Sequence, residues 1–237
     1  DLEGVFGLPP CHVDPAVGKY GLENTLWPVG TKFLEVVAPI QENTAAGRYL
    51  DRRGGDGGYM VICQVPTKAE QDEVRARAAG QGVRVAHESD YGKWRLMQLH
   101  PGDMRATFFE ADWDEKAEMD GNWEPAGGGG WESAIRRDVV SDILAAEIQS
   151  DDPEALAAHW GAVAGLPVER RDGAPVVALA NAALRFAKAE DGRGPGLGAL
   201  DLKVEDRARL LREAEARGAR VSDDQVIVCG ARFNLIE

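Results

Sequence analysis

The sequence predicts an α+β protein built from paired copies of one small module, in which a strand, a helix and three further strands follow each other (βαβββ). Strand-like runs close four times on similar phrases, at 33–39, 107–112, 183–190 and 232–237. An apolar strand and a helical stretch precede the second and the fourth of these runs. Modules that repeat in this way pair to bury their sheets, and the pairing leaves a concave sheet face that can carry a site.

The second module shows the order of elements most clearly. Its apolar strand at 59–65 leads into a helix at 68–80. Alternating apolar and polar residues then predict half-buried strands at 83–89, 93–99 and 106–112.

The first module keeps the end of a helix at 1–6 and a hairpin-like pair of strands at 19–30 and 31–39. No strand precedes the helix, so we expect this module to be truncated at its N-terminus. The polar connection at 41–58 includes AAGRYLDR, which favours a helical turn.

The third and fourth modules follow the same pattern. The third begins with the run at 139–150, and its helix at 151–165 has Asp151 or Asp152 as the cap, Pro153 early and Gly165 at the end. Its remaining strands lie near 175–180 and 183–189, and the fourth module fills 196–237, with its strand at 196–204 and its helix at 207–218.

The module order predicts two tandem domains. The first covers 1–113, a Gly-rich linker covers 114–137, and the second covers 138–237. The linker is placed there because the composition shifts to charged residues and then to four glycines in a row, Gly127–Gly130, which cannot sustain a packed element.

Composition narrows the class of protein. The 237 residues are 44% hydrophobic and 28% charged, with a formal net charge of −13 and a pI near 4.8. This balance argues against binding to nucleic acid or to an anionic membrane, because both need clustered Lys and Arg. No apolar stretch is long enough to span a bilayer, and no signal peptide pattern is present.

The three cysteines, Cys11, Cys63 and Cys229, show no CxxC spacing. We therefore expect neither a disulfide framework nor a zinc knuckle, and we expect a cytoplasmic protein. Expected partners are a small-molecule ligand and, for the chain itself, a monomeric or homodimeric state.

The module pattern resembles the vicinal oxygen chelate (VOC) superfamily, which includes glyoxalase I, methylmalonyl-CoA epimerase, ring-cleaving dioxygenases and antibiotic-resistance proteins. FLEVVAP at 33–39 is similar to the segment that donates an oxygen ligand in glyoxalase and epimerase relatives, which implies Glu35. HPGDMRATFFE at 100–110 is similar to the HP…E segment of the epimerase branch, whose final ligand corresponds to Glu110. DPAVGKYGLEN and RRGGDGGYMV are similar to uncharacterised glyoxalase-like relatives.

The resemblance implies a divalent metal (Mg, Mn, Zn, Ni or Fe) held by Glu35 and Glu110. The ligand set is incomplete, because Met60 stands where the family carries a His, and a thioether is a poor ligand for a hard ion. The site is therefore also compatible with no metal at all. In the second domain the corresponding positions read approximately Ala145, Arg185 or Phe186, Ala199 and Asn234, which cannot build a metal site, so this half is interpreted as a degenerate duplicate.

Alternation places the side chain of Glu35 opposite to those of Leu34 and Val36, and the side chain of Glu110 opposite to those of its neighbours. Each carboxylate can face either a cavity or plain solvent. If both face one cavity, they form either a metal site or a general acid/base pair.

Other candidates come from the adjoining segments. His100 at a strand end is either a turn histidine or a residue that orients substrate or carries a proton. His12, Tyr20, Asn24 and Met60 are candidates for substrate binding, against core packing and turn roles. His87 and His159 are interpreted as surface or helix-face residues.

Three functional hypotheses follow. The first is a glyoxalase-like isomerase, epimerase or lyase that acts on a small 2-oxo, hydroxy or acyl-thioester substrate by proton abstraction, with Glu35, Glu110 and His100 as catalytic residues. The second is a non-catalytic protein that binds or sequesters a small molecule, as antibiotic-resistance relatives do. An extradiol dioxygenase ranks last, because neither domain displays the two-His-one-carboxylate triad that its iron needs. The apolar side chains Phe33, Trp94, Met97 and Phe108 can line the cavity, and they fit a packed core equally well.

Overall fold

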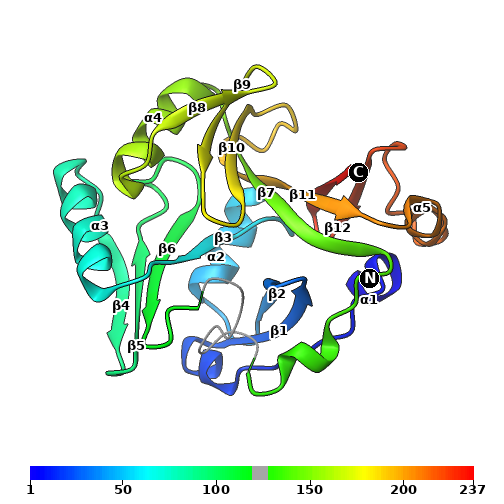
Figure 1. Cartoon of the computed structure of the whole chain (residues 1–237), viewed down its shortest axis with the longest axis horizontal. Coiled ribbons are helices and arrows are strands. Elements are labelled where there is room, and N and C mark those ends of the chain that lie inside the picture. The colour runs from blue at the N-terminus through cyan, green and yellow to red at the C-terminus, as the bar shows by residue number, and fades with distance from the viewer. Residues whose placement is uncertain (119–127) are drawn as a thin grey trace. The chain divides into compact units, whose positions relative to one another are not determined.

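The protein was analysed as a computed structural model that describes residues 1–118 and 128–237 (Figure 1). The chain combines helices with sheets that hold antiparallel as well as parallel strand pairs, which confirms the predicted α+β fold class. None of the described helices is long and apolar enough to cross a membrane.

The described residues form two compact units. Unit 1 contains residues 1–57, the described part of 120–144, and 199–237. Unit 2 contains the described part of 58–119, and 145–198. Each unit therefore joins one module from each expected domain, the first with the fourth and the second with the third. The domain boundaries at 1–113, 114–137 and 138–237 describe the order of the repeats and stay a prediction; residues 119–127 of the expected linker lie outside the described residues.

The second module lies in unit 2 and has the predicted βαβββ order. Its elements are β3 (Met60–Gln64), α3 (Lys68–Gly80), β4 (Val85–Asp90), β5 (Trp94–Leu99) and β6 (Phe108–Asp114). The sheet order is β3-β6-β5-β4, with β3 parallel to β6 and the other pairs antiparallel. Helix α3 lies beside this sheet (Figure 1), and it begins where the Thr67 hydroxyl accepts a hydrogen bond from the Glu70 amide.

The third module repeats this topology in unit 2. Its elements are β7 (Val140–Ser150), α4 (Pro153–Ala164), β8 (Val168–Arg171), β9 (Ala174–Ala178) and β10 (Ala183–Lys188), and the strand order is β7-β10-β9-β8. Asp152 caps α4 by accepting from the amide of Ala155, and Gly165 ends it at a φ of 74°, a conformation that favours glycine. The sequence had left the cap between Asp151 and Asp152. Strand β7 begins in unit 1 and continues into unit 2.

Unit 1 contains the hairpin of the first module and the whole of the fourth module except the start of β11. Its elements are α1 (Leu2–Phe6), the 3-10 helix η1 (Pro15–Tyr20), β1 (Leu22–Val29), β2 (Lys32–Pro39), α2 (Ala45–Arg53), the 3-10 helix η2 (Trp131–Ala134), β11 (Gly196–Val204), α5 (Arg207–Ala216), β12 (Gln225–Val228) and β13 (Ala231–Ile236). Strands β1 and β2 are antiparallel, and β11, β13 and β12 are adjacent in that order. Helix α2 confirms the helical turn expected in 41–58.

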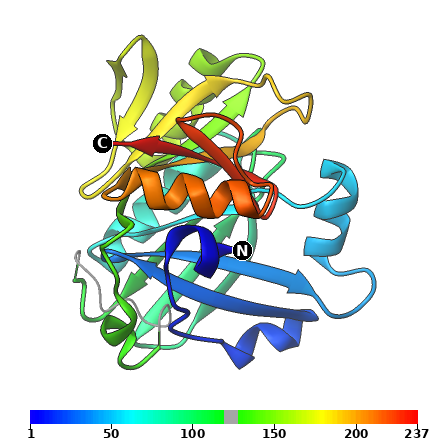
Figure 2. The same ribbon diagram turned by 90° about the vertical axis from the view of Figure 1, so that its right-hand side faces the viewer.

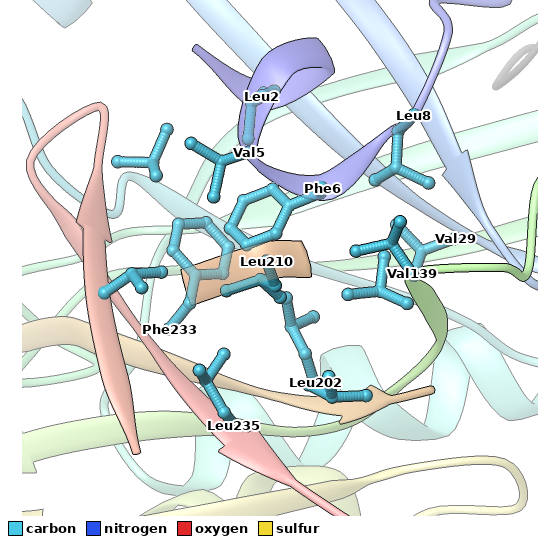
Figure 3. Packing of buried hydrophobic residues seen from close by; sticks show 14 of the residues in the cluster. Leu2, Val5, Phe6, Leu8, Val29, Val139, Leu202, Leu210, Phe233 and Leu235 are labelled. Carbon is cyan, nitrogen blue, oxygen red and sulfur yellow. The ribbon is translucent and has the colours of Figure 1, made fainter. Parts of the chain in front are cut away.

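Helices α1 and α5 pack side by side (Figure 2) and share one apolar core with the strands of unit 1. The ring centroids of Phe6 and Phe233 lie 4.9 Å apart. Leu202 of β11 and Leu210 of α5 are fully buried in the same core (Figure 3). In unit 2 the corresponding contact joins Phe109 of β6 to Trp160 of α4, with ring centroids 5.2 Å apart. Because these apolar side chains point from the strands toward the core, the alternate side chains point to the opposite face of each sheet.

Candidate functional site

Glu35 on β2 is held in place by a buried amide. Asn24 on β1 is 7% exposed, and its Nδ2 donates a hydrogen bond of 2.6 Å to Glu35 Oε1. The Oδ1 of Asn24 accepts a 2.9 Å hydrogen bond from the backbone amide of Asp14. Two of the predicted site residues, Asn24 and Glu35, are therefore brought into contact within unit 1.

The carboxyl of Glu35 remains open to solvent, whereas its neighbours Leu34 and Val36 pack in or against the core. Loss of hydration among the surrounding protein atoms raises its pKa, the Asn24 hydrogen bond lowers it, and the charge of Asp14 raises it. A carboxylate that is accessible, fixed and partly desolvated is suited to take up a proton.

A second set of acidic side chains lies on β6 in unit 2. Glu110, Asp112 and Asp114 are two residues apart from one another, so all three side chains point to the same face of the sheet, which we call the carboxylate face. Glu110 and Asp114 are buried, at 6% and 2% exposure. The opposite face carries Phe109 and Ala111, which belong to the core.

The carboxyl groups of Glu110 and Asp112 can form a hydrogen bond to each other only when one of them holds a proton. The pKa of Asp112 is raised well above its ordinary value, first by burial, then by the charge of Glu110 and by this shared hydrogen bond; the charge of Asp114 adds to the rise. A hydrogen bond from the Met97 amide acts in the other direction. The pair can therefore bind a proton at a pH where an ordinary aspartate is ionised.

Neighbouring strands complete the carboxylate face. In register with β6 are Met60 beside Phe108, Ile62 beside Glu110, and Gln98 beside Glu110 on the other side. His87 on β4 lies next to Gln98. The mixture of a thioether, apolar side chains, amides and an imidazole can hold a small organic molecule.

The structure also places the other predicted site residues. Met60 lies on the carboxylate face. His100 follows β5 and faces Asp103, with 3.7 Å between His100 Nδ1 and Asp103 Oδ1. The guanidinium of Arg84 binds Asp103 and holds the pKa of that carboxyl near 2. His100 therefore lies beside the charged side chains of Asp103 and Arg84, and its part in orienting substrate or carrying a proton stays a prediction.

His12 and Tyr20 lie in unit 1 at the edge of the β1-β2 hairpin. His12 forms an isolated bridge with Leu26 of β1, and Tyr20 is 41% exposed under the ammonium of Lys19. Their roles in substrate binding stay predictions.

Two side chains lie deeper than a cavity wall or a surface position would place them. Met97 belongs to the core, the second of its two expected places, because alternation from Gln98 turns it to the core face, where it is fully buried. His159 was interpreted as a surface or helix-face residue, but it is 5% exposed, and its Nε2 lies 2.9 Å from the carbonyl oxygen of Asp103, while burial lowers its pKa. Trp94 and Phe108 are half-buried on the carboxylate face.

Metal binding is not supported by the donor groups. In residues 1–118 and 128–237, no three His, Cys, Asp or Glu side chains gather in a way that could hold a metal ion. Glu110 and Asp112 supply carboxylates, but the neighbouring Met60 supplies a soft thioether, and this set does not fit a closed site for a hard ion. Glu35 belongs to unit 1 and Glu110 to unit 2, and their joint ligation of a metal stays a prediction.

Sequence reasoning missed Asp112, Asp114 and Gln98, and it set His87 aside as a surface residue. The alternation in FFEADWD already places Asp112 and Asp114 on the side of Glu110. Gln98 and His87 could be found only through the register of β5 and β4, which depends on contacts between strands.

Cys63 on β3 is not a reactive group. Burial, with a contribution from the charge of Asp112, raises the pKa of its thiol to about 12. Almost no thiolate then exists near neutral pH, so Cys63 is suited to packing and not to nucleophilic attack.

The modules of the C-terminal half carry different polar groups at the corresponding positions. Arg185 on β10 forms an ion pair with Glu147 on β7, with 2.7 Å between Nη1 and Oε2. In unit 1, Asn234 on β13 donates to Asp201 at 2.7 Å and accepts from Gln225 at 2.8 Å. Ion pairing and amide bonding replace the carboxylate pair of the second module.

Comparison with known families identifies the chain. A family model of a glyoxalase-like domain matches residues 15–164, more than half of the chain, and another model of a glyoxalase-like domain matches residues 145–226. No curated protein matches the sequence.

Solved structures share the fold at low sequence identity. A hypothetical protein from Staphylococcus aureus has a TM-score of 0.61 and 13% identity, over 98% of this chain and 90% of that chain. The Mn(II)-bound glyoxalase from Novosphingobium aromaticivorans has a TM-score of 0.61 and 13% identity, over 98% and 74%. A mutant of 4-hydroxymandelate synthase from Streptomyces coelicolor has a TM-score of 0.62 and 17% identity, over 93% and 71%. The repeated βαβββ modules and the family matches together show that the chain belongs to the glyoxalase-like domain family of the VOC superfamily.

Proposed function

We propose that the protein moves a proton at a carbon atom next to a carbonyl group in a small 2-oxo acid, hydroxy acid or acyl thioester. The observation that carries this proposal is the state of Glu35, a solvent-accessible carboxylate that a buried amide holds in place and whose pKa is raised. A general base works best when its pKa approaches the working pH, and partial desolvation moves a glutamate in that direction.

In the proposed reaction Glu35 takes the proton from the carbon and returns it to the same carbon or to a neighbouring one. Return to a neighbouring atom gives isomerisation. Epimerisation needs a proton donor other than Glu35 on the opposite side of the same carbon, because one fixed carboxylate reaches only one face. Glu110 and Asp112 offer a second proton-sharing pair, and His100 remains a candidate proton carrier. The proposed steps use these side chains alone.

Hydrogen–deuterium exchange tests the proposal. The protein is incubated in D₂O with a panel of 2-oxo acids, 2-hydroxy acids and acyl-CoA thioesters, and deuterium at the carbon next to the carbonyl is measured by mass spectrometry. We expect exchange into at least one compound, and we expect Glu35→Gln to slow it by about 100-fold. Glu23→Gln is the matched control, because Glu23 is an exposed glutamate on the same hairpin. Equal exchange in wild type and Glu35→Gln, or no exchange with the whole panel, rejects the proposal.

The alternative is a protein that binds a small molecule without changing it. Met60 and Phe108 favour this alternative, because they place a polarisable thioether beside an aromatic ring on the carboxylate face. Binding of a panel compound by a Glu35→Gln, Glu110→Gln double variant, with no exchange in the wild type, would select it. A dioxygenase finds the least support, since its iron triad is not among the described side-chain clusters.

A further inference from the structure

The amide of Asn24 is positioned so that only one of its two orientations satisfies its neighbours. The backbone N–H of Asp14 can only donate, so the atom that faces it must be the carbonyl oxygen Oδ1 of Asn24. The amide nitrogen Nδ2 must then face Glu35, where it donates to Oε1 at 2.6 Å. Asn24 is buried, so its amide depends on these two partners more than an exposed amide would.

The segment that supplies the Asp14 amide is itself fixed. The side chain of Asp14 caps η1, with 2.8 Å between its Oδ1 and the amide nitrogen of Ala16. A chain of three hydrogen bonds therefore runs from the start of η1 through Asn24 to the Glu35 carboxylate. Asp14 also contributes the negative charge that acts on Glu35.

We infer that Asn24 is a positioning residue, which ties Oε1 of Glu35 and leaves Oε2 as the oxygen that exchanges a proton with the substrate. This inference rests on the proposed function. Among the described residues Glu35 makes one hydrogen bond, and Oε1 makes it, while the side chain stays accessible to solvent. A catalytic carboxylate must be held in orientation to work, and an amide on one oxygen sets both the orientation and the reacting oxygen.

The Asn24→Asp variant tests this inference, because it keeps the shape of the side chain and removes the N–H donor. Two quantities are measured on the full chain: the titration midpoint of the Glu35 carboxyl by ¹³C NMR, assigned through Glu35→Gln, and the rate of deuterium exchange. We expect the midpoint to rise by about one pH unit, because a donor is lost and a negative charge is added. We expect kcat to fall about tenfold, with KM changed less than about twofold.

Asn234→Asp is the matched control. Asn234 donates through Nδ2 to the carboxylate of Asp201, so the same substitution removes the same kind of bond from a residue that has no proposed part in the reaction. We expect it to change neither the Glu35 midpoint nor the exchange rate. Should Asn24→Asp fail to fold, Asn24→Ser serves as a second variant, because its shorter side chain withdraws the donor without adding charge.

The two readouts separate this inference from the proposed function. If no panel compound takes up deuterium, the proposed function fails. A raised titration midpoint of Glu35 in Asn24→Asp would still show that Asn24 donates a hydrogen bond to the Glu35 carboxylate. An unchanged midpoint in a folded Asn24→Asp or Asn24→Ser protein overturns the inference, whatever the exchange rate. An exchange rate that depends on Glu35 but not on Asn24 overturns the assignment of Oε2.

Discussion

The strands of the second and the third module in unit 2 have the same topology, but they surround a buried acidic side chain with different partners. In the second module, β3 and β6 place Ile62 beside Glu110, and in the third module β7 and β10 place Glu147 beside Arg185 at the corresponding register. Glu110 lies beside a second acid, Asp112, whose pKa is raised, whereas Glu147 forms an ion pair with Arg185.

The next position along each strand shows the same contrast. Asp112 pairs in register with Gln64, and Ala187 pairs in register with Gln149, so the glutamine is common to both modules and the aspartate is not. In the third module, Arg185 neutralises the buried carboxylate of Glu147, which suits a structural role for this module. The second module keeps adjacent acids together at a cost in stability, which is typical of a functional site.

The largest expected effect comes from removing the cation of the third module. Arg185→Leu leaves the carboxylate of Glu147 buried without its ion-pair partner, and we expect a loss of about 3 kcal/mol in the free energy of unfolding. Urea unfolding measures it. Arg171→Leu breaks an exposed pair with Glu169 and should cost less than about 0.5 kcal/mol. A similar, small cost for both variants would remove the distinction between the two sheets.

A smaller effect of opposite sign is expected on the carboxylate face. Asp112 has a raised pKa in the folded state, so its contribution to stability is fully present below the ordinary pKa of about 4 and is lost as the pH rises through the folded value. Asp112→Asn should therefore raise the free energy of unfolding by about 1–2 kcal/mol near pH 8, and the gain should vanish near pH 4.

Asp90→Asn is the control for this variant, because Asp90 lies at the exposed end of β4. Its unfolding free energy should follow the wild type across the pH range. If Asp112→Asn lowers the free energy of unfolding near pH 8, the Asp112 carboxylate does not destabilise the folded protein, and the prediction is contradicted.

The smallest change in the free energy of unfolding is expected when the third module receives the carboxylate that the second module has. Ala187→Asp introduces a carboxylate at the position that corresponds to Asp112, but Arg185 two residues earlier can compensate its charge. We expect the unfolding free energy to change by less than about 1 kcal/mol. Combined with Arg185→Leu, the same substitution should cost more than the sum of the two single changes, and simple additivity would contradict the compensation by Arg185.

Local patterns in the sequence were sufficient to predict the order of elements in each module and the direction of single side chains on strands. Period-two alternation placed Glu35 and Glu110 opposite to the core, and the cap and glycine signals placed α4. The family resemblance, carried by FLEVVAP and by HPGDMRATFFE, is confirmed by the glyoxalase-like matches.

The features that the sequence could not supply depend on contacts between distant segments. The ion pair of Glu147 with Arg185 requires the parallel register of β7 and β10, and the row from Glu110 to His87 requires three strands in register. The hydrogen bond from Asn24 to Glu35 requires the register of the hairpin. The joining of first with fourth and second with third modules is set by the cores that these modules share, not by their order.

The pairing of the first module with the fourth in unit 1 affects how the chain folds during translation. Unit 1 closes its core through Phe6 near one end of these 237 residues and Phe233 near the other. Translation supplies the partners of α1 last, while all strands of the second module emerge in one continuous stretch. The apolar side chains of α1 and the first hairpin can therefore be fully buried only after β13 has been synthesised.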